Sequence, residues 1–125
     1  MEEPIVRRPK ASGRFEVSAW LYMRLSGLLL VLMVLAHFGI MHLHYGVSHI
    51  NFSVVALRYQ TPFWRVYDLV MVALAVTHGM NGAKMILDDY VHPRGWRTAA
   101  LCAVWAVGLV FLVTGGFTIL TFGGR

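Results

Sequence analysis

The chain has 125 residues, enough for one domain, and its composition excludes an ordinary soluble fold. Apolar residues make up 58% of it and charged residues only 14%, against about a quarter in a typical soluble domain. The net charge of +5 does not indicate nucleic-acid binding, because the basic residues flank apolar runs and do not alternate with stacking aromatics. The excess of apolar surface therefore predicts a protein that sits in lipid.

Three apolar runs, at about residues 19–43, 63–87 and 98–122, are each long enough to span a bilayer, which takes about 20 residues. Backbone groups in hydrocarbon must pair within their own segment, so we expect helices and an all-α fold. The prediction is a single domain over residues 1–125, with a cytoplasmic tail at 1–18 and an outer loop at 44–62. In that loop, a stripe of Ile50, Val54 and Leu57 favours a short helix lying on the membrane and ended by Pro62.

The distribution of Lys and Arg predicts the orientation. If the amino terminus is cytoplasmic, eight of the 11 basic residues lie on the cytoplasmic side and three on the other. Cytoplasmic loops carry the excess of positive charge, so we expect a cytoplasmic amino terminus and an outer carboxy terminus.

The second span contains the stretch that is most informative about function, THGMNGAKMILDDY. At about 100° per residue, His78, Gly82, Met85 and Asp89 share one face of a helix. A histidine within a membrane helix is costly without a partner, and imidazole is a common axial ligand of haem iron. Gly79 and Gly82 would leave room beside it for a flat macrocycle. The alternative is an interhelical hydrogen bond with close helix packing and no cofactor.

Two further groups near the predicted cytoplasmic side have a functional and a plain interpretation. The Tyr90 hydroxyl could donate to a quinone carbonyl while Asp89 tunes it or relays protons, or both residues could simply end a helix at the interface. Arg24 could bind a haem propionate or a quinone head, or extend to the interface as an orienting charge.

His37 lies about two turns from the outer end of the first span. It could ligate a second, distal haem, or hydrogen-bond a neighbouring helix. In the third span, Trp105, Gly108, Gly115 and Gly116 predict packing or anchoring positions without catalytic chemistry.

Three motifs together resemble a known family. They are R-x-S-G in the first span (Arg24, Ser26, Gly27), PFW-x-x-x-D at the start of the second (Pro62 to Asp68), and HGMNGAKMILDDY (His78 to Tyr90). The chain resembles the hydrophobic membrane-anchor subunits of succinate dehydrogenase, and looks most like the SdhD-type anchors of actinobacteria and related lineages. One departure is Trp20, which stands four residues before the arginine, where some chains of the sister anchor have a quinone-contacting serine.

The resemblance implies an anchor in the bacterial cytoplasmic membrane, with a flavoprotein, an iron–sulfur protein and a second, sister anchor as partners. The two anchors would form a helical bundle around haem b and pass electrons to quinone, either menaquinone or ubiquinone. His78 matches the axial ligand of the haem iron, Tyr90 and Asp89 the quinone site, and Arg24 an arginine near the propionates and the quinone. Ser26 and Gly82 would line the pocket. No dicarboxylate chemistry is expected in this chain alone. The alternatives are the anchor of a menaquinol:fumarate reductase and a membrane scaffold without cofactor.

Overall fold

The computed structural model describes residues 13–123. Within them the chain consists of helices joined by turns and short irregular segments, without strands, which confirms the all-α class. The long helices are α1 (Gly13–Phe38), α3 (Pro62–Tyr90) and α4 (Arg94–Thr121). A π-helical segment η1 (Gly39–His44) continues α1, and the loop to α3 contains a short turn η2 (Val47–His49) and the helix α2 (Phe52–Arg58).

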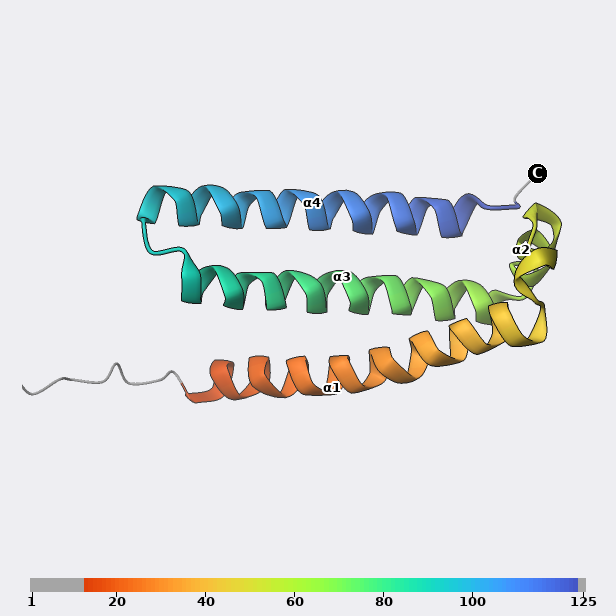
Figure 1. The fold of residues 1–125 in the computed structure, drawn as a ribbon, viewed down its shortest axis with the longest axis horizontal. Coiled ribbons are helices and arrows are strands. Elements are labelled where there is room, and N and C mark those ends of the chain that lie inside the picture. The colour runs from red at the N-terminus through yellow and green to blue at the C-terminus, as the bar shows by residue number, and fades with distance from the viewer. Residues whose placement is uncertain (1–12, 124–125) are drawn as a thin grey trace, which may run out of the picture.

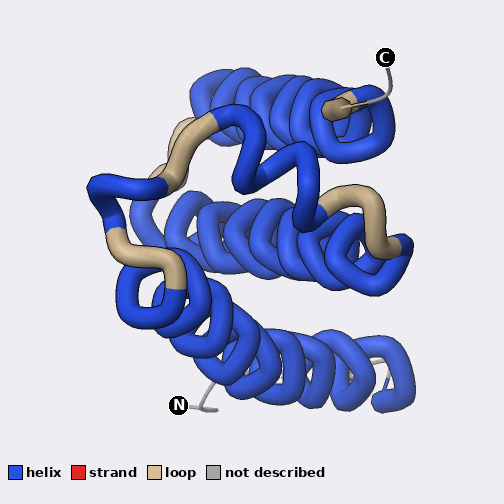
Figure 2. Tube along the Cα trace, turned by 90° about the vertical axis from the view of Figure 1, so that its right-hand side faces the viewer, coloured by secondary structure: helices blue, strands red, loops and turns tan. Residues whose placement is uncertain are grey.

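The three long helices lie side by side in one layer, with α3 between α1 and α4 (Figure 1). The start of α1, the end of α3 and the start of α4 share one end of the layer, which we call the Tyr90 end. The loop that contains α2 lies at the opposite end, which we call the α2 end (Figure 2). There Phe52 packs against Phe122, with ring centroids 4.8 Å apart, so α2 contacts the end of α4.

Three segments are long and apolar enough to cross a membrane, at Glu16–His44, Pro62–Tyr90 and Arg94–Thr121. They match the predicted spans within a few residues, but the helices extend further at the Tyr90 end. Residues 13–18, expected to belong to the tail, already form the first turns of α1. The rest of that tail, residues 1–12, lies outside the described residues, and so do four of the cations behind the predicted orientation, Arg7, Arg8, Lys10 and Arg125.

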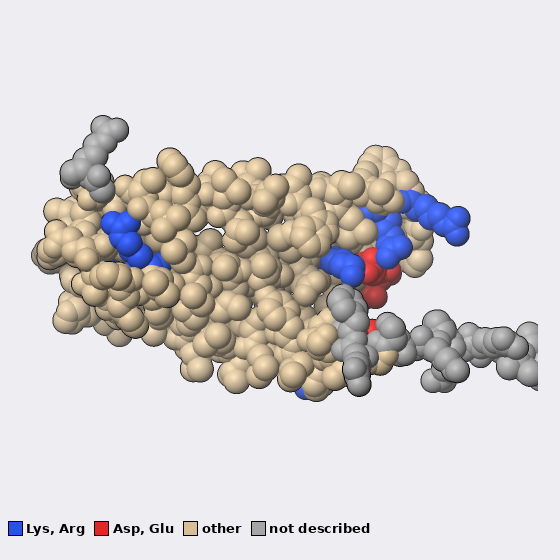
Figure 3. Space-filling view, turned by 180° about the vertical axis from the view of Figure 1, so that it is seen from behind, with Lys and Arg blue, Asp and Glu red and all other residues tan. Residues whose placement is uncertain are grey.

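Side-chain charges gather towards the two ends of the layer, and the middle of the visible face is free of them (Figure 3). Because charges are costly at the centre of a bilayer, this distribution suits a protein whose middle lies in hydrocarbon.

The helix expected in the outer loop forms, but Pro62 does not end it. α2 ends at Arg58, and Pro62 occupies the first turn of α3. Proline suits that position because the first turn of a helix has no acceptor for its N–H. The start of α2 is capped by Asn51, whose side chain accepts from the Val54 N–H at 3.1 Å.

Glycines set the distance between α3 and α4. A Cβ at Gly108 would overlap the side chain of Met80, and one at Gly115 would lie 3.2 Å from a methyl group of Val72. Small residues let helix backbones approach in lipid, and these two glycines fulfil the packing role expected from the sequence. Trp105 instead lies exposed on α4.

The end of α4 is held by a side chain from α3. The guanidinium of Arg65 donates to the carbonyl oxygens of Ile119, Leu120 and Phe122, at 3.1, 2.6 and 3.0 Å. These are among the last carbonyls of α4, which have no N–H partner within the helix. A cation there also interacts favourably with the helix dipole.

Few side chains are buried within this single layer. Among the described residues, the buried polar ones are Ser26, Arg58 and Asp68, while large apolar side chains are exposed along all three long helices. Apolar surface of this extent needs lipid or another membrane chain as its neighbour.

Candidate functional site

His78 lies between α3 and α1, not on the outside of the layer. Its ring nitrogen Nδ1 is 2.8 Å from the Ser26 hydroxyl oxygen. The Ser26 hydroxyl also lies 3.4 Å from the carbonyl oxygen of Met23, to which it donates. His78 therefore forms the interhelical hydrogen bond that its alternative interpretation expected, and this bond uses one of its two ring nitrogens.

The glycine that makes room for the imidazole comes from α1. A Cβ at Gly27 would lie 3.2 Å from the Cε1 atom of His78, whereas Gly79 has nothing within 4 Å and Gly82 faces a methyl group of Met23 at 3.9 Å. That Gly79 and Gly82 leave room beside His78 for a flat macrocycle stays a prediction. The R-x-S-G motif supplies the hydrogen-bond partner of His78, Ser26, and the glycine that leaves space beside its ring, Gly27.

Arg24 stands on α1 two residues before Ser26, about 3 Å further towards the Tyr90 end along the helix axis. Its guanidinium lies over the Trp20 ring, 4.0 Å from the centroid. The stacked arrangement is a cation–π contact. Since α1 begins at Gly13, Arg24 is about 16 Å inside the helix and close to the level of Ser26.

The last three residues of α3, Asp88, Asp89 and Tyr90, differ in their contacts. Asp88 accepts two hydrogen bonds from Arg97 of α4, at 2.9 and 2.6 Å, and so ties the α3–α4 turn together. Asp89 and Tyr90 are exposed, Tyr90 at 79%, and neither side chain forms a hydrogen bond or ion pair with any residue in the range 13–123. Within residues 13–123, their polar groups are therefore left without a partner.

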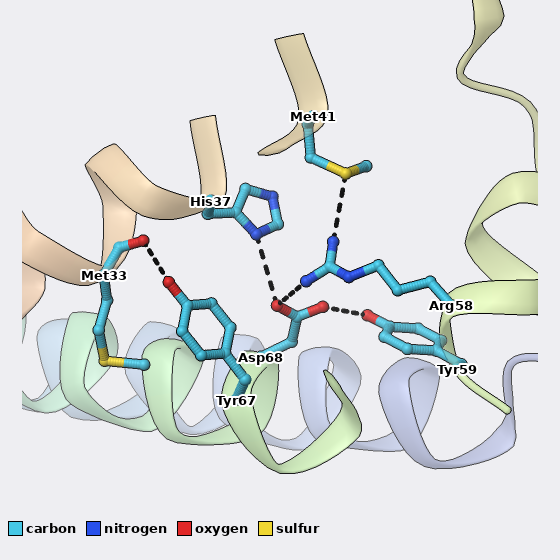
Figure 4. A network of polar contacts seen from close by, with 7 residues as sticks. All are labelled: Met33, His37, Met41, Arg58, Tyr59, Tyr67 and Asp68. Atoms are coloured by element: carbon cyan, nitrogen blue, oxygen red, sulfur yellow. Dashed lines mark hydrogen bonds and ion pairs between the residues drawn. The ribbon is translucent and has the colours of Figure 1, made fainter. Parts of the chain in front are cut away.

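A second polar cluster, at the α2 end, was not predicted from the sequence. Asp68 of α3 accepts from the Arg58 guanidinium and from the Tyr59 hydroxyl, both at 2.8 Å (Figure 4). Arg58 also reaches the Met41 sulfur at 3.2 Å and lies over the Trp64 ring, 4.5 Å from its centroid. The signal in the sequence was the carboxylate of Asp68 inside an apolar span, since such a group needs a partner.

His37 belongs to this cluster. Its Nδ1 atom lies 3.4 Å from an Asp68 carboxylate oxygen, at ion-pair distance but without hydrogen-bond geometry (Figure 4). The contact joins α1 and α3, but the interhelical hydrogen bond considered as the alternative for His37 is not formed. Its role as a distal haem ligand stays a prediction.

Tyr59 stands in the loop between α2 and α3 and has a raised pKa. Burial is the main cause, followed by the hydrogen bond to Asp68 and the repulsion that its carboxylate would exert on a phenolate. Together these raise the pKa of Tyr59 to about 12, against the attraction of Arg58 and Arg65 for a phenolate. Tyr59 is therefore a donor to Asp68 at any physiological pH.

One face of α3 and α4 forms an apolar groove of about 530 Å³. Most of its lining residues are small or aliphatic: Ala75, Val76, Gly79, Ala83, Ala103, Val104, Val107 and Gly108, with Met80 and Phe111. A groove of this kind faces lipid or another membrane helix.

Three candidate membrane-spanning helices, a paired imidazole inside the layer and a largely apolar exterior define the class. This is a multi-pass membrane protein that carries polar groups at the depth of its apolar segments.

Comparison with known proteins gives the family. Residues 3–117 match the model of the succinate dehydrogenase/fumarate reductase transmembrane subunit family, and the chain belongs to this family. It is also similar to a succinate dehydrogenase hydrophobic membrane anchor subunit of Archaeoglobus fulgidus. The two are 33% identical over 85 residues, which cover 68% of this chain and 72% of that protein.

Proposed function

We propose that this chain is a membrane anchor and cytochrome b subunit of a succinate:quinone oxidoreductase, with His78 as an axial ligand of haem b. The observation that carries the proposal is the placement of His78. Its imidazole lies at the depth of the apolar spans, bonded through Nδ1 to Ser26 and resting against Gly27. Family membership supports the same function.

The residues around His78 fit a haem. A metal-ligating histidine uses one ring nitrogen for the metal and gives the other to a hydrogen-bond partner, which is the arrangement that Ser26 supplies. Arg24 stands two residues before Ser26 on α1, about 200° around the helix axis, and does not share a face with it. The family resemblance assigns Arg24 to a propionate, where its guanidinium could bind a carboxylate with two parallel hydrogen bonds. Haem b, when bound, supplies one-electron redox chemistry.

One layer of three helices cannot enclose a macrocycle. If His78 holds a haem, another membrane chain would supply the other protein ligand and the other wall, and we take that chain to be the sister anchor. Membrane bundles hold cofactors in this way, between side chains of facing helices. The exposed apolar surface and the groove of small residues on α3 and α4 give such a partner a surface on which to pack.

The quinone would bind near the Tyr90 end of the layer. The Tyr90 hydroxyl has no partner in the described chain, and it can donate a hydrogen bond to a quinone carbonyl. Asp89, its neighbour, can accept and pass on a proton during quinone reduction. This assignment puts the Tyr90 end on the cytoplasmic side of a bacterial inner membrane, where the flavoprotein and iron–sulfur subunits would dock.

The test is a reduced-minus-oxidised spectrum of the purified membrane complex, for the natural chain and for His78→Ala. We expect His78→Ala to lose the low-spin haem b signal. His42→Ala is the matched control, because His42 is exposed in η1 and stacks on Phe38. An unchanged spectrum in His78→Ala would show that the ligand assignment is wrong and would favour a scaffold without cofactor.

The family description also covers fumarate reductase, and the alternative proposed from the sequence is the anchor of a menaquinol:fumarate reductase. The two directions are distinguished by comparing turnover of the complex with succinate plus quinone and with fumarate plus menaquinol. Counting haems per complex tests His37, since one haem per complex removes the distal site.

A further inference from the structure

Ser26 is a deeply buried polar side chain in the interface between α1 and α3, with 3% of its surface exposed. Its hydroxyl contacts two groups, the Nδ1 atom of His78 at 2.8 Å and the carbonyl oxygen of Met23 at 3.4 Å. The hydroxyl proton can point to only one of these two groups at a time, and its direction decides which tautomer of the His78 imidazole fits.

The Met23 carbonyl can only accept a hydrogen bond, whereas a hydroxyl has one proton to donate and two lone pairs. The contact between Ser26 and Nδ1 allows the proton to lie on either atom. Serine in a helix commonly donates to a carbonyl one turn earlier, and the Met23 carbonyl oxygen lies within reach at 3.4 Å. With its proton on Met23, the Ser26 oxygen can accept from His78 only if Nδ1 carries a hydrogen. A neutral imidazole carries one proton, so Nε2 then keeps its lone pair.

We propose that Ser26 is a positioning residue, which holds His78 in the tautomer with the proton on Nδ1 and so presents the lone pair of Nε2 to the haem iron. This rests on the proposed function, because it assigns a role to Ser26 only if His78 is the ligand. The relay runs from His78 Nδ1–H to the Ser26 oxygen, and from the Ser26 hydroxyl to the Met23 carbonyl.

Gly27 complements the hydrogen bond by fixing the position of the ring. The space where its side chain would begin is 3.2 Å from His78 Cε1, the carbon between the two ring nitrogens. Ser26 therefore determines which nitrogen carries the proton, while the bare backbone of Gly27 lets the ring lie close to α1. Adjacent residues of one motif control both the orientation and the tautomer of His78.

The role proposed for Ser26 predicts how the midpoint potential and the retention of a bound haem change when the hydroxyl is removed. A hydrogen bond accepted from Nδ1–H makes the imidazole a better electron donor to the metal. A better donor stabilises the oxidised iron more than the reduced iron, so removal of the Ser26 hydroxyl should raise the midpoint potential. It should also weaken haem retention, since partners of metal-ligating histidines typically contribute a factor of about ten to a hundred in metal affinity.

The experiment uses the purified membrane complex and two measurements, the rate of haem transfer to excess apomyoglobin and the midpoint potential of the haem b band. Ser26→Ala should release haem about tenfold faster or more and show a higher midpoint potential. Ser26→Thr keeps the hydroxyl and should behave like the natural chain. Thr77→Val is the matched control, because it removes a hydroxyl that bonds Tyr22 and the Ala73 carbonyl but not His78.

The inference is overturned if Ser26→Ala has the haem transfer rate and the midpoint potential of the natural chain. It is also overturned if Ser26→Thr changes both quantities as much as Ser26→Ala does, because packing would then be the cause. The outcome for His78→Ala distinguishes a failure of the proposed function from a failure of the role of Ser26. If His78→Ala keeps the haem b spectrum, the proposed function fails; if it loses the spectrum while Ser26→Ala is unaltered, only the role of Ser26 fails.

Discussion

Arg58 and Asp68 form a buried ion pair at 2.8 Å, with side chains 2% and 6% exposed. The pair joins the end of α2 to the second turn of α3, and Tyr59 donates to the other carboxylate oxygen. The loop between α1 and α3 is thus fastened at the α2 end by a carboxylate that belongs to a membrane-spanning helix. Its charge is balanced by a cation ten residues away in the sequence.

Asp68→Asn should destabilise the protein strongly. The substitution leaves the Arg58 guanidinium buried without its countercharge, and breaking a buried pair from one side typically costs about 3–5 kcal/mol. Asp88→Asn is the matched control, because it breaks the Arg97–Asp88 pair, whose side chains are 46% and 34% exposed. Exposed pairs contribute about 1 kcal/mol or less. Thermal unfolding of the complex in detergent measures both, and equal effects would contradict the structural role of the buried pair.

Alkaline pH should destabilise the folded protein by ionising Tyr59. Its pKa is raised to about 12 from an ordinary 10.0, so the folded protein holds this proton more tightly than the unfolded chain does. The stabilisation is complete below about pH 10 and is lost as the pH rises towards 12. The difference in tyrosinate absorbance between the natural chain and Tyr59→Phe should therefore develop near pH 12. A difference that develops near pH 10 would mean that Tyr59 is exposed to water and not bonded to Asp68.

The three spans could be predicted from the sequence because hydropathy is a local property. A run of about 20 apolar residues is constrained to be helical by the lack of water around it, whatever its neighbours. The ends of the helices were less predictable. Residues 13–18 are polar or mixed, yet they continue α1, because the hydrogen-bond pattern of a helix does not stop where the apolar residues do.

Contacts between helices could not be predicted in the same way. The helical period shows which residues share a face, but it does not show which faces meet. His78 was identified because an imidazole in a membrane helix is unusual. Ser26 was named only through the family motif, and its bond to His78 depends on the packing of α1 on α3. The Asp68 cluster was missed for the same reason, since Arg58 and His37 reach it from the loop and from α1.

Gly27→Ala should disturb the proposed haem site without breaking a helix. Alanine is favourable in helices, but its Cβ would lie 3.2 Å from His78 Cε1, so the ring must move by a few tenths of an ångström. We expect a weakened haem b band in the reduced-minus-oxidised spectrum. Gly39→Ala is the control, since a Cβ there meets nothing within 4 Å and should leave the band unaltered. A natural spectrum in Gly27→Ala would indicate that the ring can rest elsewhere.

Tyr90→Phe tests the quinone assignment by separating two activities of the complex. The variant lacks the hydroxyl that would donate to the quinone carbonyl, and a single such hydrogen bond contributes about 1 kcal/mol, or roughly a fivefold change in binding. We therefore expect quinone-linked turnover to fall about fivefold or more, while succinate oxidation with an artificial dye is retained. Tyr45→Phe removes a tyrosine hydroxyl at the α2 end and should alter neither activity. Equal losses with quinone and dye in Tyr90→Phe would indicate a defect in assembly, because the dye reaction does not need the quinone site. A natural rate with both acceptors would remove Tyr90 from that site.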